Sequence, residues 1–371
     1  MSSVAMTAAA QGAPAGGGQQ QVPFLLGSNI YSEPPFFSYT IQMDGAQHTV
    51  LPVPQVTPGN FLDGITLVVT SASGVLGTTA SLTADGTLGI ISYLSFVNTN
   101  GGEILYPMGL LEYVYAQKYL RPWRGDPRGY SGFSNTINPA VTVELNMGVK
   151  DTLAILSNTD ARRQYRFNCI LAPITSLVTA TTGVTAPTVT VTGYLNAWRQ
   201  PPATDYAGRP INPFPPGLGV QRKLMAQTII MPASGTARLR LVLTGDEIRG
   251  LVFIFRSSAG ARVDLTDANA GPIMFRMDNG IQWTMLPSQI IQRMEAFYNQ
   301  YFGRGQLNRE TGVYALPRFR SPNGGDAWLP TVEQTYLEIE LGSADVASGT
   351  VEVIYDQLAV GIDLPASLES V

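Results

Sequence analysis

The pattern of apolar and polar positions along the chain predicts many short strands. From Pro35 onward, segments rich in β-branched and aromatic residues follow one another, separated by Gly, Pro, Asn or Asp. Examples are "FFSYTIQM", "GITLVVTSASG", "AVTVELNM" and "TVTVTGYLNAW". The 38 glycines and 26 prolines supply turns between them. Strands this short, with turn signals at this spacing, are typical of a β-sandwich or a barrel.

Two segments interrupt the strand pattern with the periodicity of a helix. They are "EILYPMGLLEYVYAQKYLRPW" and "WTMLPSQIIQRMEAFYNQYFG". In the first, one apolar face with a charged end carries Leu110, Leu111, Val114, Tyr115 and Lys118. Each segment has a proline near the predicted start, Pro107 or Pro287, where a proline suits the first helical turn. We therefore expect helices over residues 108–120 and 288–302.

The second half of the chain repeats the first in order and pattern. "FLDGITLVVTSASG" matches "DEIRGLVFIFRSSAG" and aligns Gly64 with Gly250, and "ILYPMGLLEYVYA" matches "TMLPSQIIQRMEA" and aligns Leu110 with Ile290. Between the halves, "WRQPPATDYAGRPINPFPPGLG" is rich in proline and has the character of an extended, semi-rigid linker. The chain therefore reads as one β-sandwich unit, with a helix late in its strand order, made twice.

The composition narrows the classes of function. Charged residues make up only 13% of the chain, and the formal net charge is -4. The basic residues are scattered and form no patch, which argues against nucleic-acid binding as the primary role. A low charge fits a protein that covers its surface with neighbours, although it also fits strand-rich folds in general. No stretch of about 18 or more uncharged apolar residues occurs, so we expect no transmembrane helix.

The residues that carry chemistry are few. The single histidine, His48, cannot build a metal site of several histidines such as duplicated jelly-roll enzymes use. The single cysteine, Cys169, lies in an apolar strand pattern and is expected to be a buried small hydrophobe. Asp264, Asp267 and Asn269 could hold a calcium ion, although an Asx turn at a strand end explains them more simply, and both interpretations stay open. We expect no catalytic residue, metal or cofactor, and no enzymatic activity.

This arrangement resembles the double jelly-roll major capsid proteins of the tectivirus-like (adenovirus hexon) lineage, which includes tailless phages with an internal membrane. The resemblance rests on the two late helices, the linker, a small-residue arm, and the stretch "GVYALPRFRSPNGGDAWLPTVEQTYLEIEL". It implies an all-β fold of two tandem jelly-roll β-sandwiches, each with a short inserted helix in its later half. It also implies a structural subunit of an icosahedral viral shell, forming pseudo-hexagonal trimeric capsomers. The loops are mostly short, so no decorated outer surface is expected.

The predicted organisation has four parts. A flexible N-terminal arm spans 1–22, the first jelly roll 23–198, the Pro-rich linker 199–219 and the second jelly roll 220–371. The arm is rich in small residues and glutamine and carries no charge, so it cannot fold by itself. A disordered leader and an arm that orders on a partner remain alternatives.

The resemblance also implies partners and a location. The expected partners are the chain itself, as a homotrimer and then a shell lattice, other virion proteins, and an internal membrane reached through the N-terminal arm, without sequence-specific nucleic acid. The expected location is the virion, after assembly in the host cytoplasm. The helical segments hold too many aromatic rings for one narrow buried stripe, so some should contact a neighbouring subunit. The candidate subunit-contact residues are Tyr113, Tyr115, Tyr119, Trp123, Phe297, Tyr298 and Tyr301.

Two other functions compete with the capsid interpretation. A carbohydrate-binding or hydrolytic β-sandwich protein would show exposed aromatic and acidic residues in its loops, often with calcium. The shell fold of tailed phages would need a long spine helix, and this sequence predicts no helix beyond about four turns. The second of these is the weaker alternative.

Overall fold

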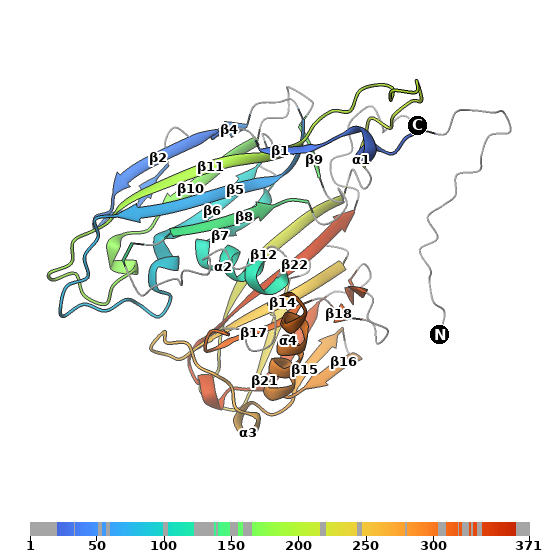
Figure 1. Ribbon diagram of the computed structural model, residues 1–371. Helices are drawn as coiled ribbons and strands as arrows, with labels where there is room; N and C mark the ends of the chain where they lie inside the picture. The colour runs from blue at the N-terminus through green and yellow to red at the C-terminus, as the bar shows by residue number, and fades with distance from the viewer. Residues whose placement is uncertain are drawn as a thin grey trace.

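The computed structural model describes most of the chain between residues 21 and 360 (Figure 1). The described residues are 21–32, 34–50, 54–56, 60–98, 103–121, 137–138, 140–148, 155–158, 165–215, 220–242, 247–278, 280–302, 309–317, 319–320, 326–327, 329–331 and 336–360. The first 20 residues of the predicted arm, Trp123 and much of the segment from residue 318 to 335 lie outside them.

The strands of the first half form two antiparallel sheets that enclose one core. The strands are β1 (Ile30–Ser32), β2 (Phe37–Gln42), β3 (His48–Thr49), β4 (Gln55–Val56), β5 (Phe61–Ala72), β6 (Ile91–Val97), β7 (Glu103–Met108), β8 (Ala140–Asn146), β9 (Leu156–Ser157), β10 (Tyr165–Leu171) and β11 (Thr188–Trp198). One sheet has the order β1-β11-β5-β8, with β2 paired to β11 and β9 to β5. The other has the order β3-β10-β6-β7, with β4 paired to β10.

The strands of the second half repeat this arrangement. They are β12 (Val220–Ile230), β13 (Thr236–Leu241), β14 (Glu247–Arg256), β15 (Ile273–Met277), β16 (Gly280–Met285), β17 (Val313–Pro317), β18 (Phe319–Arg320), β19 (Asp326–Ala327), β20 (Leu329–Pro330), β21 (Leu337–Gly342) and β22 (Thr350–Val360). The sheets have the orders β12-β22-β14-β17, with β20 paired to β14, and β13-β21-β15-β16. Strands β18 and β19 pair with each other.

The main strands of one roll have counterparts in the other. Strand β5 corresponds to β14, β11 to β22, β8 to β17 and β7 to β16. The predicted fold class is confirmed: the chain is all-β, with two tandem jelly-roll sandwiches and few short helices. In Figure 1 the first roll lies above the second.

The sequence repeat is confirmed at the level of single residues by a β-bulge in each roll. In the first roll Asn196 pairs with Gly64, and the next pair skips Asp63. In the second roll Asp356 pairs with Gly250, and the next pair skips Arg249. A bulge places one extra residue in one strand and bends it. The two glycines matched by sequence thus occupy the same position beside the same irregularity.

The two predicted helices follow equivalent strands but differ in length and start. The first consists of α2 (Leu110–Tyr115) and a π-helical turn η2 (Ala116–Leu120), whereas the second is α4 (Pro287–Phe302). The predicted role of proline at the helix start is right for Pro287, the first residue of α4. It is wrong for Pro107, which lies inside β7. Gly109 precedes α2 instead, in extended conformation.

Short helical elements complete the described structure. They are α1 (Phe24–Gly27), η1 (Gly86–Ile90), η4 (Ile174–Ser176), α3 (Asp267–Ala270) and η5 (Ala344–Val346). The ring of Phe24 packs against Phe61, with ring centroids 5.4 Å apart, and against Trp198 at 6.4 Å. Val22, the last residue of the predicted arm, is buried, and its amide donates a hydrogen bond to the carbonyl of Pro210. Val22 therefore packs against the segment around Pro210.

Candidate functional site at the junction of the two jelly rolls

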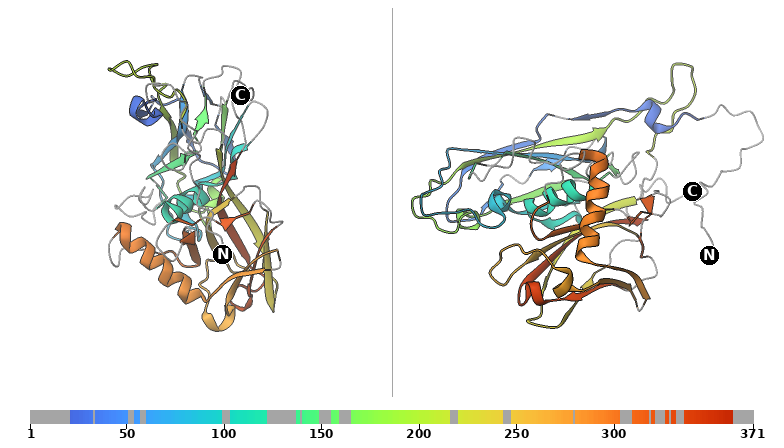
Figure 2. Two further views of the ribbon diagram at one scale, coloured as in Figure 1. Left: turned by 90° about the vertical axis from the view of Figure 1, so that its right-hand side faces the viewer. Right: turned by 60° about the horizontal axis from the view of Figure 1, so that its bottom comes forward.

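The segment α2–η2 is buried on every side because it lies between the two rolls (Figure 1). Between Leu110 and Leu120 every residue is buried except Glu112, which is half-buried. The turn η2 contacts β14, β17 and β22 of the second roll. By contrast, α4 runs along the outside of the second roll and exposes a polar face (Figure 2). One helix of the duplicated pair is thus enclosed between the rolls, whereas the other keeps one face exposed at the surface.

Tyrosines and one glutamate hold η2 against the second roll. The carboxylate of Glu310 accepts a hydrogen bond from Lys118 Nζ at 2.8 Å and another from the hydroxyl of Tyr119. The hydroxyl of Tyr298, on α4, donates to the backbone carbonyl of Tyr119, and the two rings meet edge to face at 5.8 Å. Burial, reinforced by the charge of Glu310, raises the pKa of both tyrosines, so both hydroxyls stay protonated as donors.

A buried ion cluster lies where β12 of the second roll meets the first roll. Arg222 forms a two-pronged contact with Asp356, at 2.7 and 3.1 Å, and Arg249 adds a third contact at 3.2 Å. The remaining amino group of Arg222 donates to the carbonyl of Asn146 in the first roll at 2.7 Å. Burial alone would raise the pKa of Asp356, but the two guanidinium groups outweigh it and lower this pKa to about 2.

A pair of carboxyl groups crosses the same junction. Glu112 of α2 and Glu352 of β22 lie close enough for their carboxyl groups to interact. Arg256 lies between Glu352, at 3.9 Å, and Asp85 of the first roll, at 2.8 Å. Burial, then the charge and hydrogen bond of Glu112, raise the pKa of Glu352 to about 9. At neutral pH Glu352 therefore keeps its proton and can donate it to Glu112.

The structure places the seven candidate subunit-contact residues as follows. Trp123 lies outside the described residues, and the side chain of Tyr301 is not among those described. The other five are at most 5% exposed within the single chain: Tyr113, Tyr115, Tyr119, Phe297 and Tyr298. Rings with so little free surface can add little area to a subunit contact, because the two rolls already cover them. A single chain does not test a contact with a neighbour, and that role stays a prediction.

The three residues considered as calcium ligands engage separate partners. Asp264 forms a two-pronged ion pair with Arg309, at 2.8 and 2.9 Å. Asp267 accepts hydrogen bonds from the amide and hydroxyl of Ser288, and the amide of Asn269 donates to Asp345. Within the part of the chain that the structure describes, no group of three or more His, Cys, Asp or Glu side chains is placed to hold a metal ion.

The single histidine and the single cysteine lie where the sequence pattern predicts. A ring nitrogen of His48 lies 2.9 Å from the carboxylate of Asp44, beside a turn. Cys169 is fully buried on β10, and burial raises the pKa of its thiol to about 12. The thiol is therefore an apolar core group at neutral pH. Among the described residues, no helix has the length and hydropathy needed to cross a bilayer.

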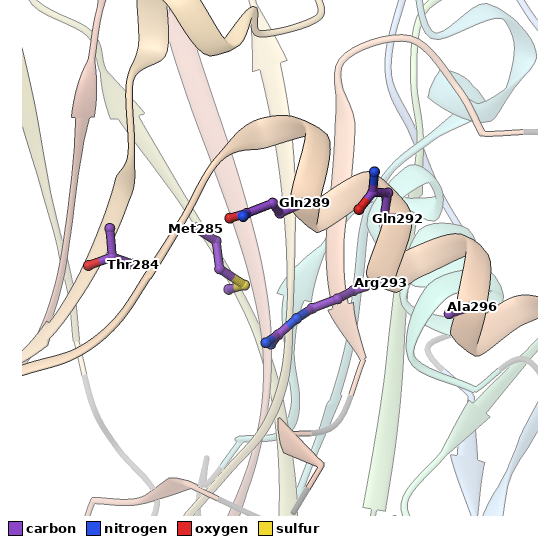
Figure 3. Close-up of a pocket in the computed structure, with 6 residues that line it drawn as sticks. All are labelled: Thr284, Met285, Gln289, Gln292, Arg293 and Ala296. Carbon is purple, nitrogen blue, oxygen red and sulfur yellow. The ribbon is translucent and has the colours of Figure 1, made fainter. Parts of the chain in front are cut away.

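A shallow groove of about 420 Å³ lies between the end of β16 and the start of α4 (Figure 3). It is lined by Thr284, Met285, Gln289, Gln292, Arg293 and Ala296. Apart from Met285, these residues are partly or fully exposed. The groove is open and of mixed polarity, and its lining residues do not include the acid, base and nucleophile of a catalytic site.

Comparison with known proteins gives a match only at the level of structure. No family model matches the chain, and no curated protein matches its sequence. The crystal structure of the major capsid protein of Sulfolobus turreted icosahedral virus superposes with a TM-score of 0.62 and 14% identity, covering 92% of this chain and 99% of that one. A chain in the atomic structure of the same virus gives 0.61, with 16% identity and coverages of 92% and 95%. The chain therefore has the double jelly-roll fold that this major capsid protein also has.

Proposed function

We propose that this protein is a structural subunit of an icosahedral viral shell. The observation that carries the proposal is the extent of the structural match, which includes both rolls and 99% of a known major capsid protein. The crystal structure that gives this match is of a capsid protein rather than an enzyme. The buried junction supports the same role, because it fixes two rolls as one rigid building block through a helix, an ion cluster and a carboxyl pair.

The subunit is further proposed to form homotrimeric, pseudo-hexagonal capsomers. Three chains with two similar rolls each would place six rolls in a ring, a shape that fits a six-coordinated lattice position. Its partners would be further copies of itself and other virion proteins, without sequence-specific nucleic acid. The location would be the virion, after assembly in the host cytoplasm, and the N-terminal arm would contact neighbours or an internal membrane beneath the shell.

The oligomeric state gives the first test. Full-length protein at micromolar concentration should sediment at three times the 39.8 kDa mass of the chain, and electron microscopy should show ring-shaped capsomers or shells. Sedimentation as monomers alone would contradict the trimer. A stable monomer that binds glycans on an array would instead favour the carbohydrate-binding alternative.

The arm gives a second prediction. Deleting residues 1–20 should leave a trimer whose melting temperature stays within about 2 °C of the full-length value, since the deletion ends before the anchored Val22. Shell formation should become defective in electron micrographs, because the lost contacts lie between capsomers.

A longer deletion provides the control for the arm. Removing residues 1–27 also removes α1, so Phe61 and Trp198 lose the buried ring of Phe24, and the melting temperature should fall. If the protein lacking residues 1–20 forms normal shells, the arm has no role in assembly and is only a disordered leader.

A further inference from the structure

The outer face of one sheet in the second roll is covered by the first roll. Along β22 both faces are buried: Val351 and Val353 face the core of the roll, while Ile354 and Asp356 on the opposite face are at most 2% exposed. The cover consists of α2–η2, β7 and the Asp85 loop of the first roll. A strand buried on both faces indicates a sheet inside an assembly rather than at its surface.

The equivalent face of the first roll has no such cover within the described part of the chain. Strand β11 alternates strictly, with Val189 and Val191 fully buried and Thr190, Thr192 and Tyr194 half-exposed. The neighbouring strand β2 continues this outer face with exposed hydroxyl and amide side chains. Thr192 lies four residues before Asn196 at the bulge of the first roll, and Glu352 lies four residues before Asp356 at the bulge of the second. The two residues therefore occupy equivalent positions.

The counterpart of the covering helix is the surface helix α4. The sequence match of Leu110 with Ile290 also aligns Val114 with Met294, and all four side chains are at most 1% exposed. This alignment places Gln292 at the position of Glu112, the residue that contacts Glu352. Gln292 lies on the face of α4 that lines the groove beside β16 (Figure 3).

We propose that the α4–β16 face of one chain packs on the outer face of the β2-β11-β5 sheet in a second copy of this chain. The contact would repeat between subunits the junction that α2–η2 and β7 make within one. This inference rests on the proposed capsomer: in a ring of three chains, the second roll of each chain would lie beside the first roll of the next chain. The exposed face of α4 would then cover a neighbouring roll, as α2–η2 covers the second roll within one chain.

The chemistry of the two faces is complementary and differs from the internal junction. Hydroxyl groups already pair across the sheet face, with Thr192 Oγ1 at 3.1 Å from Ser38 Oγ and Thr190 Oγ1 at 2.9 Å from Thr40 Oγ1. Gln289 and Gln292 on α4 can donate to and accept from such groups. The charged side chains described on α4 are Arg293 and Glu295, which have opposite signs and are both exposed. Such a face suits subunits that must first fold separately, because neither side has to carry a buried ion before assembly.

A charge placed in the centre of the sheet face tests the proposal. Thr192→Arg should raise the concentration at which half of the trimer dissociates by about 100-fold, because the large guanidinium would have to fit into the packed interface beside the like charge of Arg293 in the α4 groove. The matched control is Thr236→Arg, an exposed position on β13 at the sheet edge opposite β16. The control should remain trimeric. Circular dichroism of both variants checks that the subunit is folded.

Cross-linking provides an independent readout that does not depend on a destabilising variant. The only native cysteine is fully buried, so a Thr192→Cys, Gln292→Cys double variant offers two accessible thiols per chain. A short bis-maleimide should give covalent dimers and closed trimers and no larger species, whereas a Thr236→Cys, Gln292→Cys pair should give neither. A wild-type trimer that survives Thr192→Arg and fails to cross-link overturns this interface but leaves the proposed function standing. A wild-type protein that never forms trimers overturns the proposed capsomer itself.

Discussion

Asp356→Asn should lower the free energy of unfolding by about 3–5 kcal/mol, the cost typical of breaking a buried ion pair by removing one partner. Arg222 and Arg249 are at most 5% exposed, and the substitution leaves both guanidinium groups facing a neutral amide. Urea denaturation followed by tryptophan fluorescence measures the loss. Because Arg222 also donates to Asn146, the second roll should loosen from the first at lower urea than wild type.

A surface ion pair offers the control for this variant. Asp205 pairs with Arg209 in an exposed turn, at 2.7 Å, and Asp205→Asn removes a carboxylate of the same type without touching the junction. Solvent screens such a pair, so the unfolding midpoint should hardly move. An Asp356→Asn protein that unfolds at the same urea concentration as Asp205→Asn would show that the ion cluster does not hold the rolls together.

Lowering the pH should also reduce the free energy of unfolding through the protonation of Asp356. The folded-state pKa of Asp356, about 2, lies below the value of an unfolded chain, so its contribution to stability is present above about pH 4 and is lost as pH falls through 2.

The fold could be predicted from the sequence because its signals are local. Strict alternation, such as that of "TVTVTGYLNAW", places Val189 and Val191 on a core face whatever surrounds the sheet. The repeat could be predicted because both halves keep a glycine, Gly64 or Gly250, at the same place in the strand pattern. In the structure each of these glycines lies beside a β-bulge, at Asp63 or at Arg249.

The junction could not be predicted with equal success, because it depends on how two similar units are placed relative to each other. The aromatic rings of the two helices have similar sequence surroundings, yet Tyr119 is fully buried between the rolls while the exposed face of α4 is polar. The sequence does carry one signal for the junction. Strand β22 mixes Glu352 and Asp356 with Ile354 and Leu358 on its outer face, whereas β11 carries Thr192, Tyr194, Asn196 and Trp198, none of them charged, at the corresponding positions. Apolar and charged residues side by side on an outer face indicate a covered sheet.

Raising the pH should weaken the folded chain, and Glu352→Gln should remove that weakness. The raised pKa of Glu352, about 9 in the folded chain, lies above the value near 4.5 of a free glutamate. A group of this kind contributes its full stability below the unfolded pKa and loses it as the pH rises through the folded pKa. Between about pH 5 and 9 the wild type should therefore lose on the order of a few kcal/mol from this site.

Glutamine keeps the shape of the protonated acid and can still donate a hydrogen bond to Glu112, but it does not titrate. Glu352→Gln should thus match the wild type near pH 5, exceed its unfolding midpoint at pH 9, and show a flatter dependence between. Asp205→Asn serves again as control: the pKa of Asp205 is lowered, first by the hydrogen bond from the amide of Arg209, so its titration lies outside this window. Equal slopes for wild type and Glu352→Gln would mean that the two carboxyl groups do not share a proton. A flattened slope would identify the contact between α2 and β22 as the place where alkaline conditions begin to separate the two rolls.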